Sequence, residues 1–111
     1  NVSPEWVEAE LLAGPLLQEA VVFGSGQARC VALLGAPAAA HDDAIDGWVR
    51  HANARLPDYA RIGAWRRLPA PLAATPGLVT ANGRPRRAAI AAHYAAELAA
   101  LYSNCEECLT A

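Results

Sequence analysis

The chain has 111 residues, of which 54% are hydrophobic and 18% are charged, and its formal net charge is −2. This composition fits one globular domain and excludes a disordered chain. The small negative charge gives no reason to expect nucleic acid as a partner. No apolar run approaches the roughly 20 residues that a transmembrane helix needs, so we expect no membrane span. All nine basic residues are arginines, so no chemistry of this chain can use a lysine.

The first predicted element is a helix that begins at Ser3-Pro4-Glu5. Serine is a typical N-cap, proline fits the first helical position, and an acid suits the first turn. Val7, Leu11 and Leu12 share the apolar face of this helix, and Gly14-Pro15 ends it. We expect a strand over residues 19–23, a turn over 24–27 and a second strand over 28–34. The short turn favours antiparallel pairing of the two strands.

The second half of the chain predicts another helix, a third strand and a last helix. Asp42 or Asp43 can cap the middle helix, and Pro57 marks its end. Its apolar face consists of Ile45, Trp48, Val49 and Ala52. Residues 59–65 form the third strand candidate, and the prolines of 68–80 exclude a regular element there. The last helix is indicated by the i, i+4 and i+3 spacing of Ile90, Tyr94, Leu98 and Leu101.

The predicted order is therefore α-β-β-α-β-loop-α. Three strands and about three helices fit an α+β fold, with a small three-stranded mixed sheet against which the helices pack.

The three cysteines, Cys30, Cys105 and Cys108, are too few for a disulfide framework and suit a reducing compartment. We therefore expect a cytoplasmic protein. Cys105-Glu-Glu-Cys108 has the spacing of a zinc or redox pair. Zinc would need two further ligands, and the pair lies in a polar C-terminal tail, so we expect no metal site. The N-terminal residues lack the pattern of a signal peptide. Because there is no initiator methionine, we expect the chain to be part of a longer protein.

Arg84, Arg86 and Arg87 stand directly before the last helix, where the helix macrodipole favours negative charge. Asn82-Gly83 predicts a tight turn with positive φ, and the lack of a Cβ at Gly83 lets a ligand approach the backbone. Arginine matches phosphate and carboxylate oxygens with a planar fork of donors. An anion held between the arginines and the helix N–H groups would offset the unfavourable interaction between these positive charges and the helix macrodipole. The alternative is a basic loop that only faces water.

Three stretches carry a wider pattern: residues 1–24 (NVSPEWVEAELLAGPLLQEAVVFG), 55–65 (RLPDYARIGAW) and 78–90 (LVTANGRPRRAAI). In this order they resemble the C-terminal domain of the adenylate-forming (AMP-binding) enzyme superfamily, nearest to the long-chain fatty acyl-CoA synthetases. The first resembles the family's Pro-x-Glu-Val-Glu helix and Val-Val-Gly strand, and the second its Leu-Pro-x-Tyr entry to a strand. The third resembles its closing motif, Leu-Thr-x-x-Gly-Lys-x-x-Arg. The residues that match are Val2, Pro4, Glu5, Val7, Glu8, Val21, Val22, Gly24, Leu56, Pro57, Tyr59, Ile62, Thr80, Gly83 and Arg87.

The resemblance implies that residues 1–102 are the mobile C-terminal domain of an acyl-CoA synthetase and that 103–111 are a polar tail. A larger N-terminal domain outside this sequence would bind ATP, with Mg²⁺, and the acid. The whole enzyme would form an acyl-adenylate and then a thioester with CoA, whereas the isolated fragment would be inactive.

The resemblance also assigns roles to individual residues. Arg84 stands where the family has its adenylation lysine and is the candidate catalytic residue. Gly83, Arg86 and Arg87 would bind substrate beside it. Arg61, in the third predicted strand, matches a basic position that can meet CoA phosphates; the alternative is a plain exposed strand arginine.

One departure keeps alternatives open, because arginine at 84 is larger and planar where the family has lysine. Arg84 either does the lysine's work in a remodelled site or marks a relative with altered adenylation. The alternatives are a stand-alone binding or regulatory module that lost the lysine, and a ligase that loads an acyl carrier protein. The acid pocket would belong to the other domain, so the chain does not define the acyl group.

Overall fold

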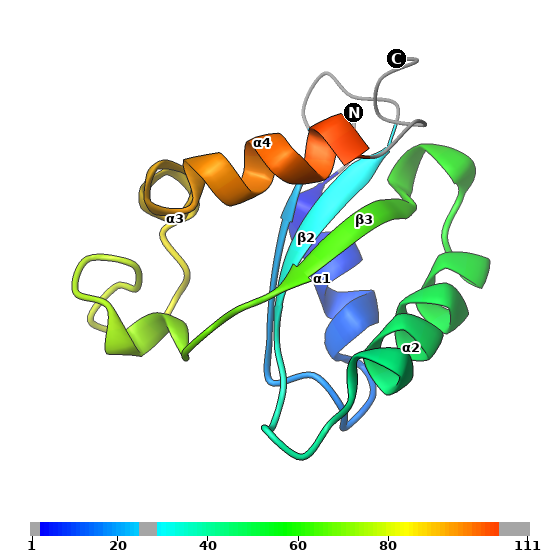
Figure 1. Ribbon diagram of the computed structural model, residues 1–111, viewed down its shortest axis with the longest axis horizontal. Helices are drawn as coiled ribbons and strands as arrows, with labels where there is room; N and C mark the ends of the chain where they lie inside the picture. The colour runs from blue at the N-terminus through cyan, green and yellow to red at the C-terminus, as the bar shows by residue number, and fades with distance from the viewer. Residues whose placement is uncertain (1–2, 25–28, 105–111) are drawn as a thin grey trace.

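A computed structural model describes residues 3–24 and 29–104 of the chain. A three-stranded sheet lies between two layers of helices (Figure 1). Strand β1 (Glu19–Phe23) pairs antiparallel with β2 (Cys30–Gly35), and β2 pairs in parallel with β3 (Ile62–Arg67), so the strand order is β1-β2-β3. This mixed sheet and the order of the elements confirm the predicted α+β fold.

The central strand β2 is buried on both faces, which explains its uninterrupted apolar sequence. Side chains alternate across the sheet, because successive residues of a strand point to opposite faces. Val22, Ala32 and Leu34 belong to one apolar core, and Val21, Val31 and Leu33 belong to the other. The sheet therefore separates two cores.

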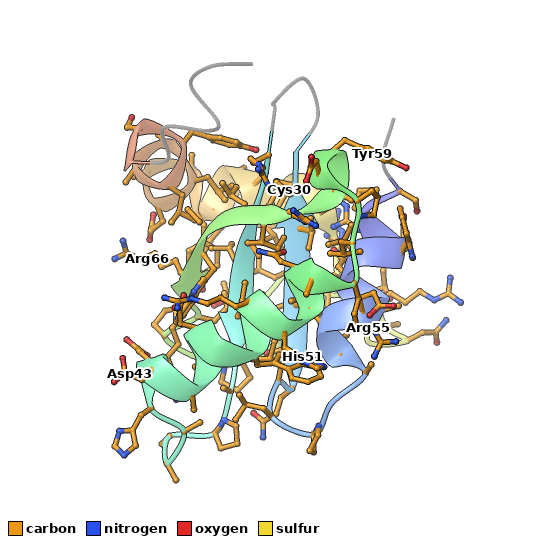
Figure 2. The ribbon with its side chains drawn as sticks, turned by 90° about the vertical axis from the view of Figure 1, so that its right-hand side faces the viewer. Cys30, Asp43, His51, Arg55, Tyr59 and Arg66 are labelled. Carbon is orange, nitrogen blue, oxygen red and sulfur yellow. The ribbon has the colours of Figure 1, made fainter. Side chains whose placement is uncertain are left out.

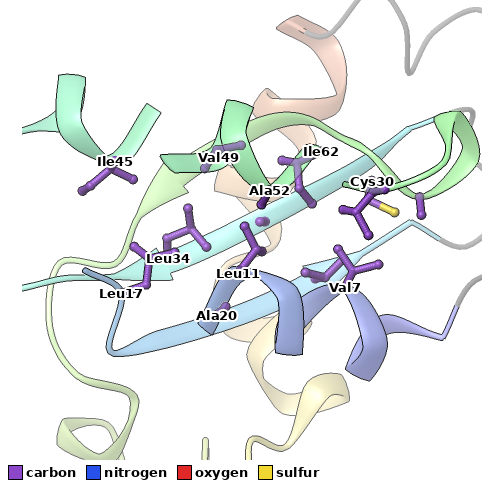
Figure 3. Close-up of a cluster of buried hydrophobic side chains, with 14 residues drawn as sticks. Val7, Leu11, Leu17, Ala20, Cys30, Leu34, Ile45, Val49, Ala52 and Ile62 are labelled. Carbon is purple, nitrogen blue, oxygen red and sulfur yellow. The ribbon is translucent and has the colours of Figure 1, made fainter. Parts of the chain in front are cut away.

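Helices α1 (Pro4–Leu12) and α2 (Asp42–Ala54) cover the first face, and Figure 3 shows their side chains packed on the sheet. Val7 and Leu11 of α1 are completely buried, as predicted, but Leu12 is 41% exposed. The predicted apolar face of α1 was therefore wrong at Leu12, and the charged residue Glu8 is buried instead.

The predicted helix caps are partly correct. Ser3 is the N-cap of α1, but its hydroxyl donates to Glu5 Oε2 at 2.9 Å instead of capping the backbone. The N-cap of α2 is His41, so the predicted cap at Asp42 or Asp43 was wrong. These two carboxylates lie in the first turn of α2, where the helix dipole favours them.

The predicted third strand was displaced in the sequence. Pro57 is followed by a short 3₁₀ turn, η1 (Asp58–Ala60), closed by the Ala60 N–H donating to the Pro57 carbonyl at 2.9 Å. The strand itself runs over Ile62–Arg67, so Arg61 precedes it. The predicted turn at 24–27 falls largely on residues outside the described part of the chain.

Helices α3 (Arg87–His93) and α4 (Ala95–Asn104) cover the second face of the sheet. The sequence predicted one helix here, but the chain bends sharply at Tyr94, and Figure 1 shows α3 along its axis while α4 lies across the view. No glycine or proline marks this bend. It brings Ile90, Tyr94 and Leu98 into one core with the sheet.

The connection from β3 to α3 is ordered although it has no long element. It contains the short 3₁₀ turn η2 (Leu72–Ala74), and Leu68, Leu72 and Leu78 are buried. The Leu72 N–H donates to both carboxylate oxygens of Glu19 on β1, at 3.1 and 3.3 Å.

None of the helices in the described ranges is long and apolar enough to cross a membrane. Helix α4 continues to Asn104, so it includes the first two residues of the predicted tail, while Cys105 and Cys108 lie outside the described residues.

Leu11 and Leu12 provide a matched test of this packing. We expect Leu11→Ala to lower the free energy of unfolding by about 2–5 kcal/mol, because it leaves a cavity in a closed core. Leu12→Ala should change it by less than about 0.5 kcal/mol, since it lies at the surface. Urea unfolding followed by circular dichroism measures both, and equal losses would contradict this assignment of the helix face.

Candidate anion-binding hairpin

Residues 78–86 form a small hairpin that leads into α3. Val79 and Pro85 form an antiparallel bridge, and the Arg86 N–H donates to the Leu78 carbonyl at 2.8 Å. At the tip, the Gly83 N–H donates to the Thr80 carbonyl at 2.9 Å, and the Thr80 N–H donates to the Arg84 carbonyl at 2.8 Å. This is the pattern of a tight turn followed by a left-handed residue. Gly83 has φ of +81°, as its sequence predicts, whereas Asn82 keeps a negative φ.

Arg84 leaves this tip with an exposed side chain. Its backbone N–H donates to Thr80 Oγ1 at 3.1 Å, which fixes its Cα. Among the nine arginines, only Arg66 and Arg84 have guanidinium groups without a hydrogen bond or ion pair to the described residues. The Arg84 guanidinium is therefore held at the end of a structured turn and is available to a ligand.

Arg86 belongs to the base of the hairpin. It is the N-cap of α3, and its Nη1 donates to the Gly77 carbonyl at 3.1 Å. Gly77, directly before the hairpin, has φ of +88°, a conformation that favours glycine. The Arg86 side chain thus holds the two ends of the hairpin together.

Arg87, the first residue of α3, is paired within the protein. Its Nη1 lies 2.6 Å from Glu8 Oε2 and its Nη2 lies 3.3 Å from Glu8 Oε1. Its Nη1 also donates to the Val22 carbonyl at 3.3 Å. Glu8, in turn, accepts the Val22 N–H at 2.8 Å. The bidentate pair therefore satisfies both outward-facing backbone groups of Val22, on the edge strand β1.

Glu5 adds a second carboxylate beside Arg87, at 3.9 Å from its Nη2. The pKa of the Glu5 carboxyl is lowered, first by the hydrogen bond from its own backbone amide and then by that of the Ser3 hydroxyl, with a smaller contribution from Arg87. The three arginines at the start of α3 consequently differ: Arg87 pairs with acids of α1, Arg86 donates to a carbonyl, and the Arg84 guanidinium faces solvent.

Arg61 closes the C-terminal end of α2. Its Nε donates to the carbonyls of Asn53 and Leu56, each at 3.0 Å, and its Nη1 lies 2.7 Å from Asp58 Oδ1. A cation on the last carbonyls of a helix interacts favourably with its dipole. Its contact with CoA stays a prediction.

The hairpin and the position of Arg61 are not brought together. The η1 turn and the start of β3 lie at one end of the molecule, and the hairpin before α3 lies at the other end (Figure 1). Arg66 is separate from both, and Figure 2 shows it extending outward from β3. The described residues contain no group of three or more histidine, cysteine, aspartate or glutamate residues that could hold a metal ion.

Glu8 is the residue of this region whose role sequence reasoning missed. It stands one position after Val7 and three before Leu11, inside the apolar stripe of α1. A carboxylate in such a stripe is buried only when it is paired. That signal was present in the sequence, but its partner lies 79 positions away.

Comparison with known proteins identifies the family of this chain. The family described as AMP-binding enzyme C-terminal domain matches residues 1–106. This chain therefore belongs to the AMP-binding enzyme C-terminal domain family. No curated protein matches the chain.

A solved structure has a similar fold: the A-PCP didomain of carboxylic acid reductase from Segniliparus rugosus in complex with AMP. The TM-score is 0.79 at 20% identity, over 92% of this chain and 16% of the other. At this identity the likeness shows the fold alone, and the chain spans only a small part of that protein.

Gly83 and Gly47 form a matched pair for testing the hairpin, because an added Cβ would meet nothing within 4 Å at either position. Gly83→Ala should lower the free energy of unfolding by about 1–2 kcal/mol through its left-handed backbone. Gly47→Ala, inside α2, should raise it by about 0.5–1 kcal/mol. Thermal or urea unfolding of both variants gives the comparison, and a Gly83→Ala variant as stable as the parent would rule out the left-handed turn.

Proposed function

We propose that this chain is the mobile C-terminal domain of an ATP-dependent acyl-CoA synthetase and that Arg84 supplies the positive charge for acid activation. The observation that carries the proposal is the solvent-facing Arg84 guanidinium on a hydrogen-bonded turn. Membership of the AMP-binding family supports ATP and an acid as substrates, bound by a preceding domain. On this proposal the isolated chain is inactive, because it contributes only one part of the site.

In the first half-reaction a carboxylate oxygen of the acid attacks the α-phosphorus of ATP. A new oxygen–phosphorus bond forms, the bond between the α-phosphorus and the bridging oxygen breaks, and pyrophosphate leaves. Negative charge accumulates on the α-phosphate oxygens during this step. A guanidinium held at the right position stabilises that charge without having to reorganise, which is the usual basis of electrostatic catalysis.

Arginine at this position has a specific chemical consequence. Its charge persists at all physiological pH values, and its two parallel N–H groups can bind two oxygens at once. Because the Arg84 side chain has no partner in the described protein, its binding to an anion would break no internal ion pair. Gly83 leaves the backbone beside it open to a ligand, since nothing lies within 4 Å of an added Cβ.

In the second half-reaction a thiol sulfur attacks the acyl carbon of the adenylate, and AMP leaves. We propose CoA as the thiol, with Arg61 as a contact for its phosphates. Arg61 lies at the other end of the domain from the hairpin, which fits a role in a different pose of the domain. A carrier-protein thiol is the second candidate acceptor, and it is favoured by the similar fold found in an A-PCP didomain.

The test uses the full-length enzyme that contains this chain. Arg84→Ala should slow pyrophosphate release by about 10²-fold or more, the usual scale for one lost transition-state donor. Thioester formation from supplied acyl-adenylate should change far less, because the hairpin acts only in the first step. Arg84→Lys restores the family residue and should retain most of the activity.

Arg66→Ala is the matched control, because Arg66 is the other arginine without a partner in the described chain. It should leave pyrophosphate release unchanged. If Arg84→Ala behaves like Arg66→Ala, Arg84 is a solvated charge and the proposal fails.

A further inference from the structure

Glu8 is the only charged residue in the buried core of the described chain, with 9% of its surface exposed. It lies on α1, which packs on the first face of the sheet. Its carboxylate is fully used, because one oxygen accepts from Val22 N–H and Arg87 Nη1, and the other accepts from Arg87 Nη2. Burial of a charge costs free energy unless such partners are present.

Arg87 begins α3, which packs on the opposite face of the sheet. The Glu8–Arg87 pair therefore passes around the β1 edge and joins the two helical layers. The contacts with Val22 N–H and Val22 carbonyl lock this link to one position along β1. A guanidinium–carboxylate pair with two contacts also fixes the relative orientation of the two side chains, which a single contact does not.

The Arg84 hairpin is built on the residue that precedes Arg87. Arg86 closes the hairpin through its N–H to the Leu78 carbonyl and through its Nη1 to the Gly77 carbonyl. Arg84 is only three positions before Arg87, so the start of α3 sets where the hairpin points. Loss of the Glu8–Arg87 ion pair would therefore release the N-terminal end of α3 from the edge of the sheet.

We infer that Glu8 is a positioning residue for acid activation: through Arg87 it holds the Arg84 hairpin in its working orientation. This inference rests on the proposed function of Arg84. Glu8 itself touches no substrate. Arg87, which the sequence suggested as a substrate-binding residue, acts on this account through its internal ion pair.

The experiment compares Glu8→Gln with Glu10→Gln in the full-length enzyme. Glu10 is also on α1, but its carboxylate pairs with Arg55, the C-cap residue of α2. Glu10 Oε2 lies 3.3 Å from Arg55 Nε. Glu8→Gln should slow pyrophosphate release by about 10-fold or more, because a small misplacement of a catalytic group has this effect. The thioester step from supplied acyl-adenylate should change much less, and Glu10→Gln should affect neither step.

A combined variant separates positioning from general damage to the fold. If Glu8 acts through Arg84, Glu8→Gln should cause no further loss of pyrophosphate release in an Arg84→Ala background. A full additional loss in that background, or equal slowing of both half-reactions by Glu8→Gln, would overturn the inference. If Glu8→Gln does not fold, Arg87→Lys takes its place, since it keeps the charge but loses the two-point contact.

Hydrogen exchange tests the structural part of the inference separately from the proposed function. If Arg84→Ala leaves pyrophosphate release unchanged, the proposed function fails, and amide exchange in the 111-residue chain decides the structural part. Glu8→Gln should then raise exchange at the Gly83 and Arg86 amides by about tenfold more than at the Val31 amide of β2, because it loosens the hairpin locally. A uniform rise across all three amides would contradict the positioning role.

Discussion

The described structure depends on how one edge strand is completed. Strand β1 has β2 on one side only, so the outward N–H and carbonyl of Val22 would be left without a strand partner. Glu8 accepts the first and Arg87 donates to the second, and the two side chains also bind each other. Unpaired strand edges are sites of unwanted association, and this arrangement closes part of the edge with charge. It also connects helices that the sheet otherwise keeps apart.

This interaction explains why three arginines can precede a helix. Arg87 forms an ion pair with Glu8 and lies close to Glu5, while Arg86 donates a hydrogen bond to a backbone carbonyl. The acids of α1 thereby offset the positive charge of Arg87, the arginine in the first turn of α3, while Arg84 stands on the hairpin tip, away from that turn. Two arginines build the support, and the third keeps an unpaired guanidinium. The structural and functional uses of the arginine cluster are thus divided among neighbouring residues.

Periodicity and turn chemistry predicted much of this fold. The strand at Glu19–Phe23, the core positions of α2 and the positive φ of Gly83 follow from local patterns. The sequence did not reveal the bend at Tyr94, because no breaking residue marks it and only packing on the sheet decides it. It also did not reveal that Glu8 replaces Leu12 on the buried face, because the arginine that makes this burial possible is far away in the sequence. The sequence predicted that Arg84 follows a tight turn, but it did not predict the contacts of Arg86 and Arg87 that hold this turn in place.

A double-mutant cycle in urea unfolding tests the central claim most directly. The cycle uses Glu8→Ala, Arg87→Ala and their combination, with Glu10→Ala and Arg55→Ala as the reference cycle on the same helix. We predict a coupling free energy of about 1–3 kcal/mol for the Glu8–Arg87 pair, because it is largely buried and shares Val22. The more exposed Glu10–Arg55 pair should give about 0.2–1 kcal/mol. A Glu8–Arg87 coupling no larger than that of the reference pair would contradict the claim that this interaction joins the two layers of the fold.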